Sequence, residues 1–278
     1  MIDSPHFSFV STGDGSSTIV LSEYGEGMHS ISGAYEEALR KHIQPSRILE
    51  REDNSLSVLD VGFGLGYNIL AMIVEFIRLK RHATLSIVSL EKERALHHAL
   101  RAISFNDGRD TAYRFVRHAY EDGYARWGDI SIRVHWGDAR KSVKGLEAGS
   151  SQAVFFDPFS LARNPVLWPT DFLREIPRVM DEKGVLTTYS SADHVRTAML
   201  DAGLMVGRGP SVGGKREGTV ASKGGSITPF TDSEHAVLRA NRKSIPYRDQ
   251  LLSADRESIL KHRRDAILVR KSDEINQV

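Results

Sequence analysis

A short run of residues, Val154-Phe-Phe-Asp-Pro-Phe-Ser160, places a carboxylate, a rigid proline and an aromatic ring together after an apolar stretch. The carboxylate of Asp157 can accept hydrogen bonds from an amine and so direct its lone pair. Pro158 fixes φ and keeps the loop from collapsing onto the preceding strand, and the ring of Phe159 can stack on a base or cover a cation. Asp157 could instead be only a helix cap, but its place after a buried strand favours chemistry.

A second motif is the glycine-rich turn Gly62-Phe63-Gly64-Leu65-Gly66, between the apolar run Leu56–Val61 and a helix predicted over Asn68–Arg81. Glycines at such a turn let the backbone approach a ligand at the carboxyl ends of the strands. The spacing differs from the G-x-G-x-x-G of dinucleotide oxidoreductases, and the sequence has no P-loop. Alone, the turn is a weak indication of a ligand.

Two acidic residues strengthen this indication because each follows a predicted strand of the same sheet. Glu91 ends the run Leu85–Leu90, where a carboxylate can bridge two ribose hydroxyls. Asp138 follows the run Ile130–His135 and could accept a hydrogen bond from an adenine amine. The turn and the two carboxylates therefore predict a nucleoside-containing cofactor.

The elements that must position these residues are buried strands alternating with helices, which predicts an α/β fold with a doubly wound, mostly parallel sheet. The predicted strands are 56–61, 85–90, 130–135, 153–157 and 185–190. Before them we expect a small N-terminal extension, residues 1–50, with a strand at 17–21 and a helix at 33–43, followed by a polar connector at 45–57. Residues 51–278 form the second predicted domain; after residue 192 it continues as a helix, a glycine-rich loop, a strand and a polar tail.

Composition excludes several classes of protein. The 278 residues are 40% hydrophobic and 26% charged, as in globular proteins. Without cysteine there is no disulfide, thiolate nucleophile or cysteine-ligated metal. The longest apolar stretch, Ile69–Ile77, is interrupted by Glu75, and no secretory signal is recognisable, so we expect a cytoplasmic protein without a membrane segment. The adjacent His97 and His98 point to different faces of a helix, so we expect no metal site.

Positive charge is concentrated near the C-terminus. Residues 208–278 contain 14 Lys/Arg and 9 Asp/Glu, a net charge of +5, whereas the other residues carry −4. This imbalance favours an anionic partner such as nucleic acid, although scattered surface charge explains many such cases. The candidate contacts to nucleic acid are Arg208, Lys215, Arg216, Lys223, Arg242, Lys243, Arg263 and Arg264.

Together, the acidic glycine-rich turn and the acidic residues after the second and third strands resemble class I S-adenosylmethionine-dependent methyltransferases. Six segments in order further resemble the MnmC-type tRNA methyltransferases over nearly the whole chain: 23–30, 59–68, 156–160, 164–168, 188–191 and 213–217. Leu65 and Tyr67 depart from the Thr and Leu of many relatives, which could alter the shape of the pocket.

The resemblance implies a Rossmann-like class I methyltransferase fold. It implies methylation of the primary amine of 5-aminomethyluridine, or its 2-thio form, at the tRNA wobble position, giving the 5-methylaminomethyl product. The cofactor would be S-adenosylmethionine, released as S-adenosylhomocysteine, without a metal. The FAD-dependent oxidoreductase domain of bifunctional members would be absent, and the partner would be the anticodon region of tRNA. We expect a monomer.

The resemblance also assigns roles to individual residues. The cofactor would be held by Tyr24, His29, Gly62, Phe63, Gly64, Asn68, Glu91, Asp138 and Asp157. The catalytic loop would be Asp157, Pro158 and Phe159. The substrate or tRNA would contact Tyr189, Lys215, Arg216, Arg208 and Lys223.

Three other functions fit the same residues. A class I methyltransferase could act on the amine of a small molecule or a protein. An aminopropyl transferase resembling spermidine synthase uses a similar fold, but it would need an acidic groove. A non-catalytic RNA-binding module would have no reason to keep the glycine-rich turn in register with three carboxylates.

Overall fold

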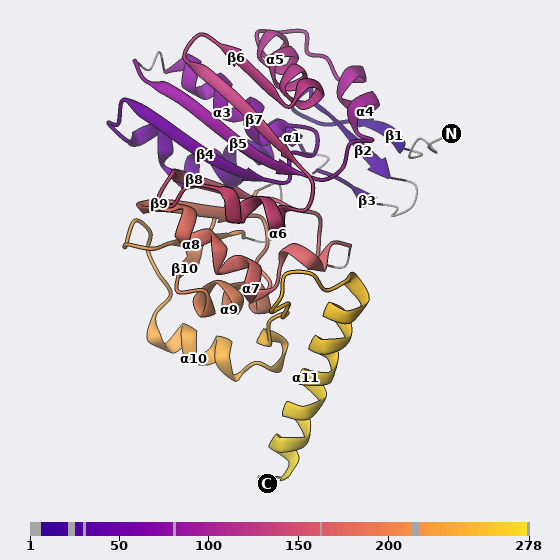
Figure 1. Ribbon diagram of the computed structural model, residues 1–278, viewed down its shortest axis with the longest axis vertical. Helices are drawn as coiled ribbons and strands as arrows, with labels where there is room; N and C mark the ends of the chain where they lie inside the picture. Colours follow the sequence, from indigo (N-terminus) through magenta and orange to yellow (C-terminus); the bar gives the residue numbers. More distant parts are fainter. Residues whose placement is uncertain are drawn as a thin grey trace.

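The computed structural model describes residues 7–21, 26–29, 32–79, 82–161, 163–212 and 217–276. Its centre is an eight-stranded sheet with the strand order β10-β11-β9-β8-β4-β5-β7-β6 (Figure 1). The strands are β4 (Ser55–Val61), β5 (Thr84–Glu91), β6 (Tyr124–Trp127), β7 (Ile130–Trp136), β8 (Ser151–Phe156), β9 (Met180–Thr188), β10 (Met205–Arg208) and β11 (Thr219–Ser222). The pairs among β7, β5, β4, β8 and β9 are parallel, and antiparallel pairs occur only towards the two ends of this sheet. The predicted α/β fold with a mostly parallel, doubly wound sheet is confirmed.

Helices cover both faces of the sheet, so the central strands are buried on both sides. One hydrophobic cluster includes residues of α1 (Ala34–Ala38), α3 (Tyr67–Arg78), α4 (His97–Ala102) and α5 (Arg109–Asp122). The other includes residues of α6 (Ala139–Ser142), α7 (Thr170–Leu173), α8 (Glu175–Val179) and α9 (Asp193–Asp201). Strand β8 serves both clusters because its side chains alternate: Ala153 and Phe155 belong to the first cluster, and Val154 and Phe156 to the second.

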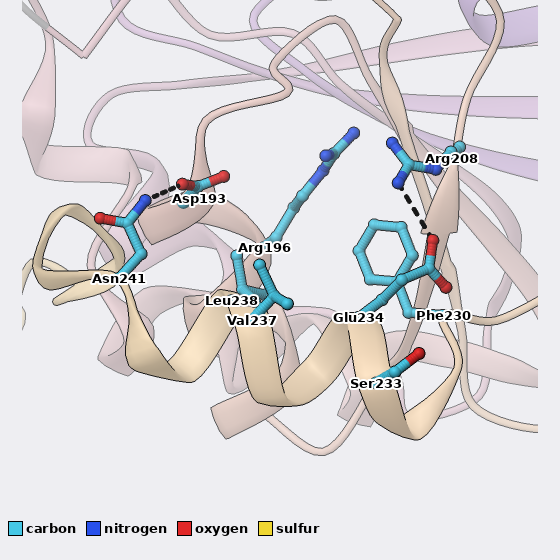
Figure 2. A pocket seen from close by; sticks show the side chains of 9 residues that line it. All are labelled: Asp193, Arg196, Arg208, Phe230, Ser233, Glu234, Val237, Leu238 and Asn241. Atoms are coloured by element: carbon cyan, nitrogen blue, oxygen red, sulfur yellow. Dashed lines mark hydrogen bonds and ion pairs between the residues drawn. The ribbon is translucent and has the colours of Figure 1, made fainter.

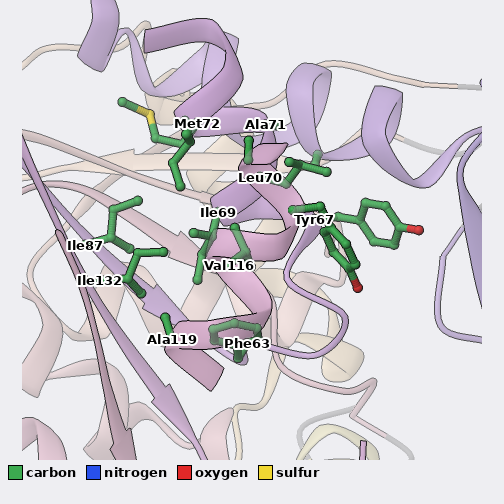
Figure 3. Close-up of a cluster of buried hydrophobic side chains, with 14 of the residues drawn as sticks. Phe63, Tyr67, Ile69, Leu70, Ala71, Met72, Ile87, Val116, Ala119 and Ile132 are labelled. Carbon is green, nitrogen blue, oxygen red and sulfur yellow. The ribbon is translucent and has the colours of Figure 1, made fainter. Parts of the chain in front are cut away.

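Helix α3 follows the glycine-rich turn and packs tightly on the sheet. Figure 3 shows Ile69 of α3 facing Ile87 and Ile132 of the two neighbouring strands, with Val116 of α5 beside it. Ile69, Val116 and Ile132 are fully buried, and Ile87 nearly so. This packing fixes the start of α3 relative to the strand ends.

The order of the strands creates a crevice between β4 and β8. From β4 the chain builds the sheet outwards through β5 to β7, and it then returns to add β8 on the other side of β4. The connections after β4 and β8 therefore leave the sheet in opposite directions, and their carboxyl ends frame a crevice where α/β proteins bind ligands.

The N-terminal residues form a separate three-stranded antiparallel sheet of β1 (Phe7–Ser11), β2 (Ser17–Leu21) and β3 (Glu26–Gly27). The backbone N–H of Ser17 donates to the hydroxyl of Tyr67 on α3 at 3.1 Å. Ile19 and Ile43 are buried in the cluster that also contains α3. The N-terminal segment thus shares a core with the main sheet, and the boundary at residues 50 and 51 stays a prediction.

Two predicted segments differ from the structure. The predicted polar connector at 45–57 instead contains the short turns α2 (Gln44–Ser46) and η2 (Ile48–Glu50), and β4 already begins at Ser55. Pro45 lies in α2, whose residues follow directly on those of η1 (Leu39–Ile43), so the helix predicted to end at residue 43 continues past this proline. The predicted polar tail is largely helical: it contains α10 (Asp232–Ala240), η5 (Arg242–Ser244) and α11 (Arg256–Asn276).

The sequence and the packing explain where the C-terminal helices begin and how they are attached to the rest of the fold. Helix α10 begins at a capping box in which Thr231 accepts from the N–H of Glu234 and Glu234 accepts from the N–H of Thr231. Helix α11 extends away from the sheet (Figure 1) and is attached through its buried Ile259. Within the described ranges, every helix is too short or too polar to cross a bilayer.

Replacing Ile69 by Ala should lower the free energy of unfolding by about 2–5 kcal/mol, because the cavity left between α3 and the sheet cannot close. Urea unfolding followed by circular dichroism measures this loss. The control is Val237→Ala on α10, whose side chain is 72% exposed, and which should change stability by less than about 0.5 kcal/mol. Equal losses in the two variants would contradict this account of the core.

Candidate active site

A cavity of about 1460 Å³ lies at the carboxyl ends of the parallel strands. Many of the predicted site residues line it: His29, Gly62, Phe63, Gly64, Asn68, Glu91, Asp138, Asp157, Pro158, Phe159 and Tyr189. Tyr24, Lys215 and Arg216 lie outside the described residues. Arg208 and Lys223 are described but do not line this cavity. Residues as far apart in the chain as Gly27 and Arg256 thus meet in one site.

The glycine-rich turn is pressed against the end of β8. A Cβ atom on Gly62, which has φ of +97°, would lie 2.9 Å from the carbonyl oxygen of Asp157. The backbone N–H of Asp157 donates to the carbonyl of Val61 at 3.0 Å, and that of Gly62 donates to the carbonyl of Leu90 at 3.0 Å. Only glycine permits this approach of the two backbones at position 62.

The carboxylate of Glu91 is fixed by three backbone N–H groups at the end of β5. Its Oε2 accepts from Gly64 at 3.0 Å, and its Oε1 accepts from Lys92 at 2.6 Å and from Glu93 at 2.7 Å. Burial raises the pKa of Glu91 despite these hydrogen bonds. Hydroxyl donors from a ribose would stabilise the buried charge, which is the role predicted for this residue.

Asp138 is bound to Arg140, a residue that sequence analysis missed. Its side chain caps α6 by accepting from the N–H of Arg140 at 3.0 Å, and its Oδ2 lies 2.7 Å from Nη2 of the Arg140 guanidinium. Burial alone would raise the pKa of Asp138. The hydrogen bonds from Arg140 outweigh this effect, so the pKa lies below its ordinary value. An adenine amine would therefore share this carboxylate with Arg140.

Arg140 also ties a distant segment to the cavity wall. Its Nη1 donates to Oδ2 of Asp249 and to the carbonyl oxygen of Ala254, both at 2.8 Å. Asp249 in turn accepts from the backbone N–H of Ser253 and of Ala254. Residues 253–256 consequently form one wall of the cavity.

The loop after β8 is held at its backbone carbonyls. The hydroxyl of Tyr189 donates to the carbonyl of Pro158 at 3.2 Å, and Nε1 of Trp168 donates to the carbonyl of Phe159 at 3.0 Å. The side chain of Asp157 is 24% exposed, and its Oδ2 accepts from Nδ2 of Asn68 at 2.9 Å. The loop thus presents a carboxylate of defined orientation to the cavity.

The N-terminal segment supplies the opposite wall. His29, one of the predicted residues, lines the cavity with its Nδ1 3.2 Å from Oγ1 of Thr18 and its ring edge-on to Tyr67. His42 also lines the cavity, with Nε2 3.6 Å from Oδ2 of Asp157. Sequence analysis missed His42, because nothing in the helix at 33–43 indicates a partner so far away in the chain.

Two basic candidates for nucleic-acid binding are engaged elsewhere. Arg208 contacts Glu217 at 2.6 Å and Glu234 at 3.0 Å, beside a separate pocket of about 250 Å³ against α10 (Figure 2). Lys223 contacts Glu182 at 2.5 Å. The register pairs Arg208 with Thr219 and Thr219 with Thr188, whereas Ser222, beside Lys223, pairs with Val185. Arg208 therefore lies at the carboxyl edge of the sheet, and Lys223 lies towards the opposite edge.

The other C-terminal candidates are helical and differ in their contacts. Arg263 of α11 donates from Nε to the carbonyl of Ile245 at 2.7 Å and from Nη2 to that of Lys243 at 2.8 Å. The side chains of Arg242, Lys243 and Arg264 are exposed. In the described part of the chain, no group of three or more His, Asp or Glu side chains is arranged to hold a metal ion.

A strand order that reverses at β4, a glycine-rich turn beside it and an acidic residue ending the next strand define a class I S-adenosylmethionine-dependent methyltransferase. The family model described as S-adenosyl-L-methionine-dependent methyltransferase matches residues 113–224. The crystal structure of MnmC2 from Aquifex aeolicus is 34% identical, with a TM-score of 0.85, over 96% of this chain and 87% of that one. This chain belongs to the MnmC-type methyltransferase family.

Two further relatives show the extent of the similarity. The uncharacterized protein MJ0670 of Methanocaldococcus jannaschii is 31% identical over 261 residues, which are 92% of this chain and 71% of that protein. The tRNA 5-methylaminomethyl-2-thiouridine biosynthesis bifunctional protein MnmC of Burkholderia vietnamiensis is 29% identical over 216 residues, or 71% of this chain and 32% of that protein. The chain thus spans about a third of the length of the bifunctional relatives it matches.

Asp60 of β4 gives a pH-dependent prediction. Its side chain is fully buried, and burial raises its pKa well above the ordinary value of 3.8 although Ser89 donates to it. The folded protein therefore keeps a proton that the unfolded chain loses, so this group's contribution to stability falls as pH rises from about 4 towards the raised pKa. Relative to Asp60→Asn, wild-type stability should fall by up to about 1.4 kcal/mol per pH unit in that window. Urea unfolding of both proteins between pH 5 and 8 measures it; a constant difference would contradict the prediction.

Proposed function

We propose that this protein transfers a methyl group from S-adenosylmethionine to the primary amine of 5-aminomethyluridine, or its 2-thio form, at the tRNA wobble position. The product is 5-methylaminomethyluridine or its 2-thio form. In this proposal the partner is the anticodon region of tRNA, and the protein acts as a cytoplasmic monomer without a metal or FAD. The names of the bifunctional relatives, which refer to tRNA 5-methylaminomethyl-2-thiouridine biosynthesis, support the choice of substrate.

The observation that carries the proposal is the orientation of Asp157. Its carboxylate opens onto the cavity, is oriented by Asn68, and extends from a loop whose carbonyls are bound by Tyr189 and Trp168. Such a group can accept hydrogen bonds from an amine and hold it in line for attack. Phe159 lines the same cavity and offers an aromatic face to the base.

The residues of the cavity fit the proposed cofactor. The glycine-rich turn faces the cavity with bare backbone, and Glu91 offers acceptors for ribose hydroxyls. Asp138, shared with Arg140, offers an acceptor for adenine. When bound, the cofactor supplies an electrophilic methyl group on a cationic sulfonium.

The protein must also remove a proton from the substrate amine before methyl transfer. An alkylamine has a pKa of about 10.4, so it enters as an ammonium ion without a lone pair. Burial of this cation beside a second cation lowers its pKa. Asp157 then accepts one proton from the ammonium, and after transfer the product leaves as a secondary ammonium.

Replacing Asp157 by Ala should lower the single-turnover rate by about 1,000-fold, because the amine loses its acceptor. The assay incubates protein and cofactor with tRNA containing 5-aminomethyluridine and measures nucleosides by mass spectrometry. Wild type should add one methyl group to that nucleoside. The control is Asp129→Ala, an exposed carboxylate just before β7 at the opposite edge of the sheet. Cofactor binding without methylation of this nucleoside would favour another amine as substrate.

Two basic residues of the C-terminal segment, Lys215 and Lys223, should differ in their effect on tRNA binding. Gly209 and Gly218, which flank Lys215 in the chain, lie at the carboxyl edge, where the N–H of Gly209 donates to the carbonyl of Gly218. Lys215→Ala should weaken tRNA binding and reduce the slope of log K against log salt by about 1. Lys223→Ala, towards the opposite edge, is the matched control and should change neither. Loss of cofactor binding in Lys215→Ala would contradict the assignment.

A further inference from the structure

His42 occupies an unusual place in the fold. It lies in a π-helical turn, η1 (Leu39–Ile43), that continues α1. Such turns are rare and often occur at functional sites. Its side chain is only 2% exposed, yet it lines the active-site cavity. A polar ring in this position needs partners for both of its nitrogens.

Both ring nitrogens of His42 face polar atoms from other elements. Nε2 lies 3.6 Å from Oδ2 of Asp157, and Nδ1 lies 2.9 Å from Oγ1 of Thr187 in β9. The same Oδ2 accepts from Nδ2 of Asn68. A polar chain thus runs from Thr187 through His42 to Asp157 and Asn68, joining β9, η1, the β8 loop and α3.

The chemistry of these partners favours one tautomer of His42. An ionised carboxylate can only accept hydrogen bonds, so a hydrogen bond from His42 to Asp157 requires the hydrogen on Nε2. Nδ1 then accepts from the hydroxyl of Thr187, which can donate. The ring of Phe155, 5.8 Å away between centroids, packs beside the imidazole.

The imidazole is neutral. Burial lowers the pKa of His42 to about 3; Glu37 and a hydrogen bond to the backbone of Thr187 oppose this shift, and Lys41 adds to it. A neutral ring can donate to Asp157 without cancelling its charge. The carboxylate therefore keeps its full charge for the ammonium of the substrate.

We propose that His42 is a positioning residue for methyl transfer: by donating from Nε2 to Oδ2 of Asp157, it holds the carboxylate in the orientation that receives the amine. The proposal rests on the proposed function. Oδ2 stays an acceptor for Asn68 and His42 throughout, whether or not the carboxyl group has taken the amine's proton on Oδ1. The distance of 3.6 Å is longer than a hydrogen bond, so the proposal requires it to shorten when substrate binds, as catalytic hydrogen bonds often do.

Replacing His42 by Phe keeps a ring and removes the donor. We expect kcat to fall by about 100-fold, the cost of misplacing a reacting group by about 1 Å, with the cofactor Kd and the KM for tRNA changed less than about twofold. His42→Gln, which restores an N–H donor, should recover part of the loss. Thr187→Val, which removes the hydroxyl that fixes the tautomer, should lower kcat by a smaller factor.

Two controls separate positioning from packing. His194→Phe removes another neutral histidine, half-buried, whose pKa is lowered to about 4 mainly by burial and whose ring packs on Tyr247; kcat should stay unchanged. In an Asp157→Ala background, His42→Phe should cause no further loss in single-turnover rate, because His42 acts through Asp157. Wild-type kcat in His42→Phe, or an equal loss in both backgrounds, would overturn the proposal. If His42→Phe fails to fold, His42→Gln and Thr187→Val test the proposal instead. A lower kcat with an unchanged KM in these variants supports it, and an unchanged kcat overturns it.

Failure of the proposed substrate is distinguishable from failure of this inference. If wild type methylates no 5-aminomethyluridine in tRNA, the substrate is wrong, and His42 is then tested by ¹⁵N chemical shifts of labelled histidine. A neutral ring protonated at Nε2, whose Nε2 signal shifts in Asp157→Ala, supports the inference. A ring protonated at Nδ1, or no response to Asp157→Ala, overturns it.

Discussion

The site depends on the contact between two backbones, the turn after β4 and the end of β8. Gly62 lies so close to Asp157 that a side chain at position 62 would collide with its carbonyl oxygen. Hydrogen bonds from Gly62 to Leu90 and from Asp157 to Val61 join the ends of three strands. Because α3 starts at this junction, Asn68 reaches the carboxylate of Asp157, and because β5 ends there, Glu91 reaches Gly64. The contact between the turn after β4 and the end of β8 therefore positions both Glu91 and Asp157 in the cavity.

Local patterns predicted this part of the molecule well. The local sequence identifies the buried run before Asp157, the glycine-rich turn and the carboxylate of Glu91. Each lies at the end of a parallel strand, where an apolar run is followed by glycine or an acidic residue. His42 and Arg140 left no such signal. Their partners, Asp157 and Asp249, are more than 100 residues away, and a single sequence does not show which distant charged or polar groups meet.

The net charge of the C-terminal segment is a poorer guide to candidate nucleic-acid contacts than the position of each residue on the sheet. A count of the basic residues from position 208 onwards does not show which of them, such as Arg208, are balanced by neighbouring carboxylates. The same segment was predicted as a polar tail, since α11 buries few of its side chains and so lacks a clear apolar stripe. The capping box before α10 was the signal that could have identified a helix.

The cavity is enclosed by both ends of the described chain. His29 and His42 come from the first 50 residues, whereas residues 253–256 are held in place through Arg140 and Asp249. During synthesis the glycine-rich turn leaves the ribosome long before residues 253–256. A growing chain can thus assemble the central sheet while its cofactor pocket still lacks a wall, so competence to bind arises only after residues 253–256 have been added.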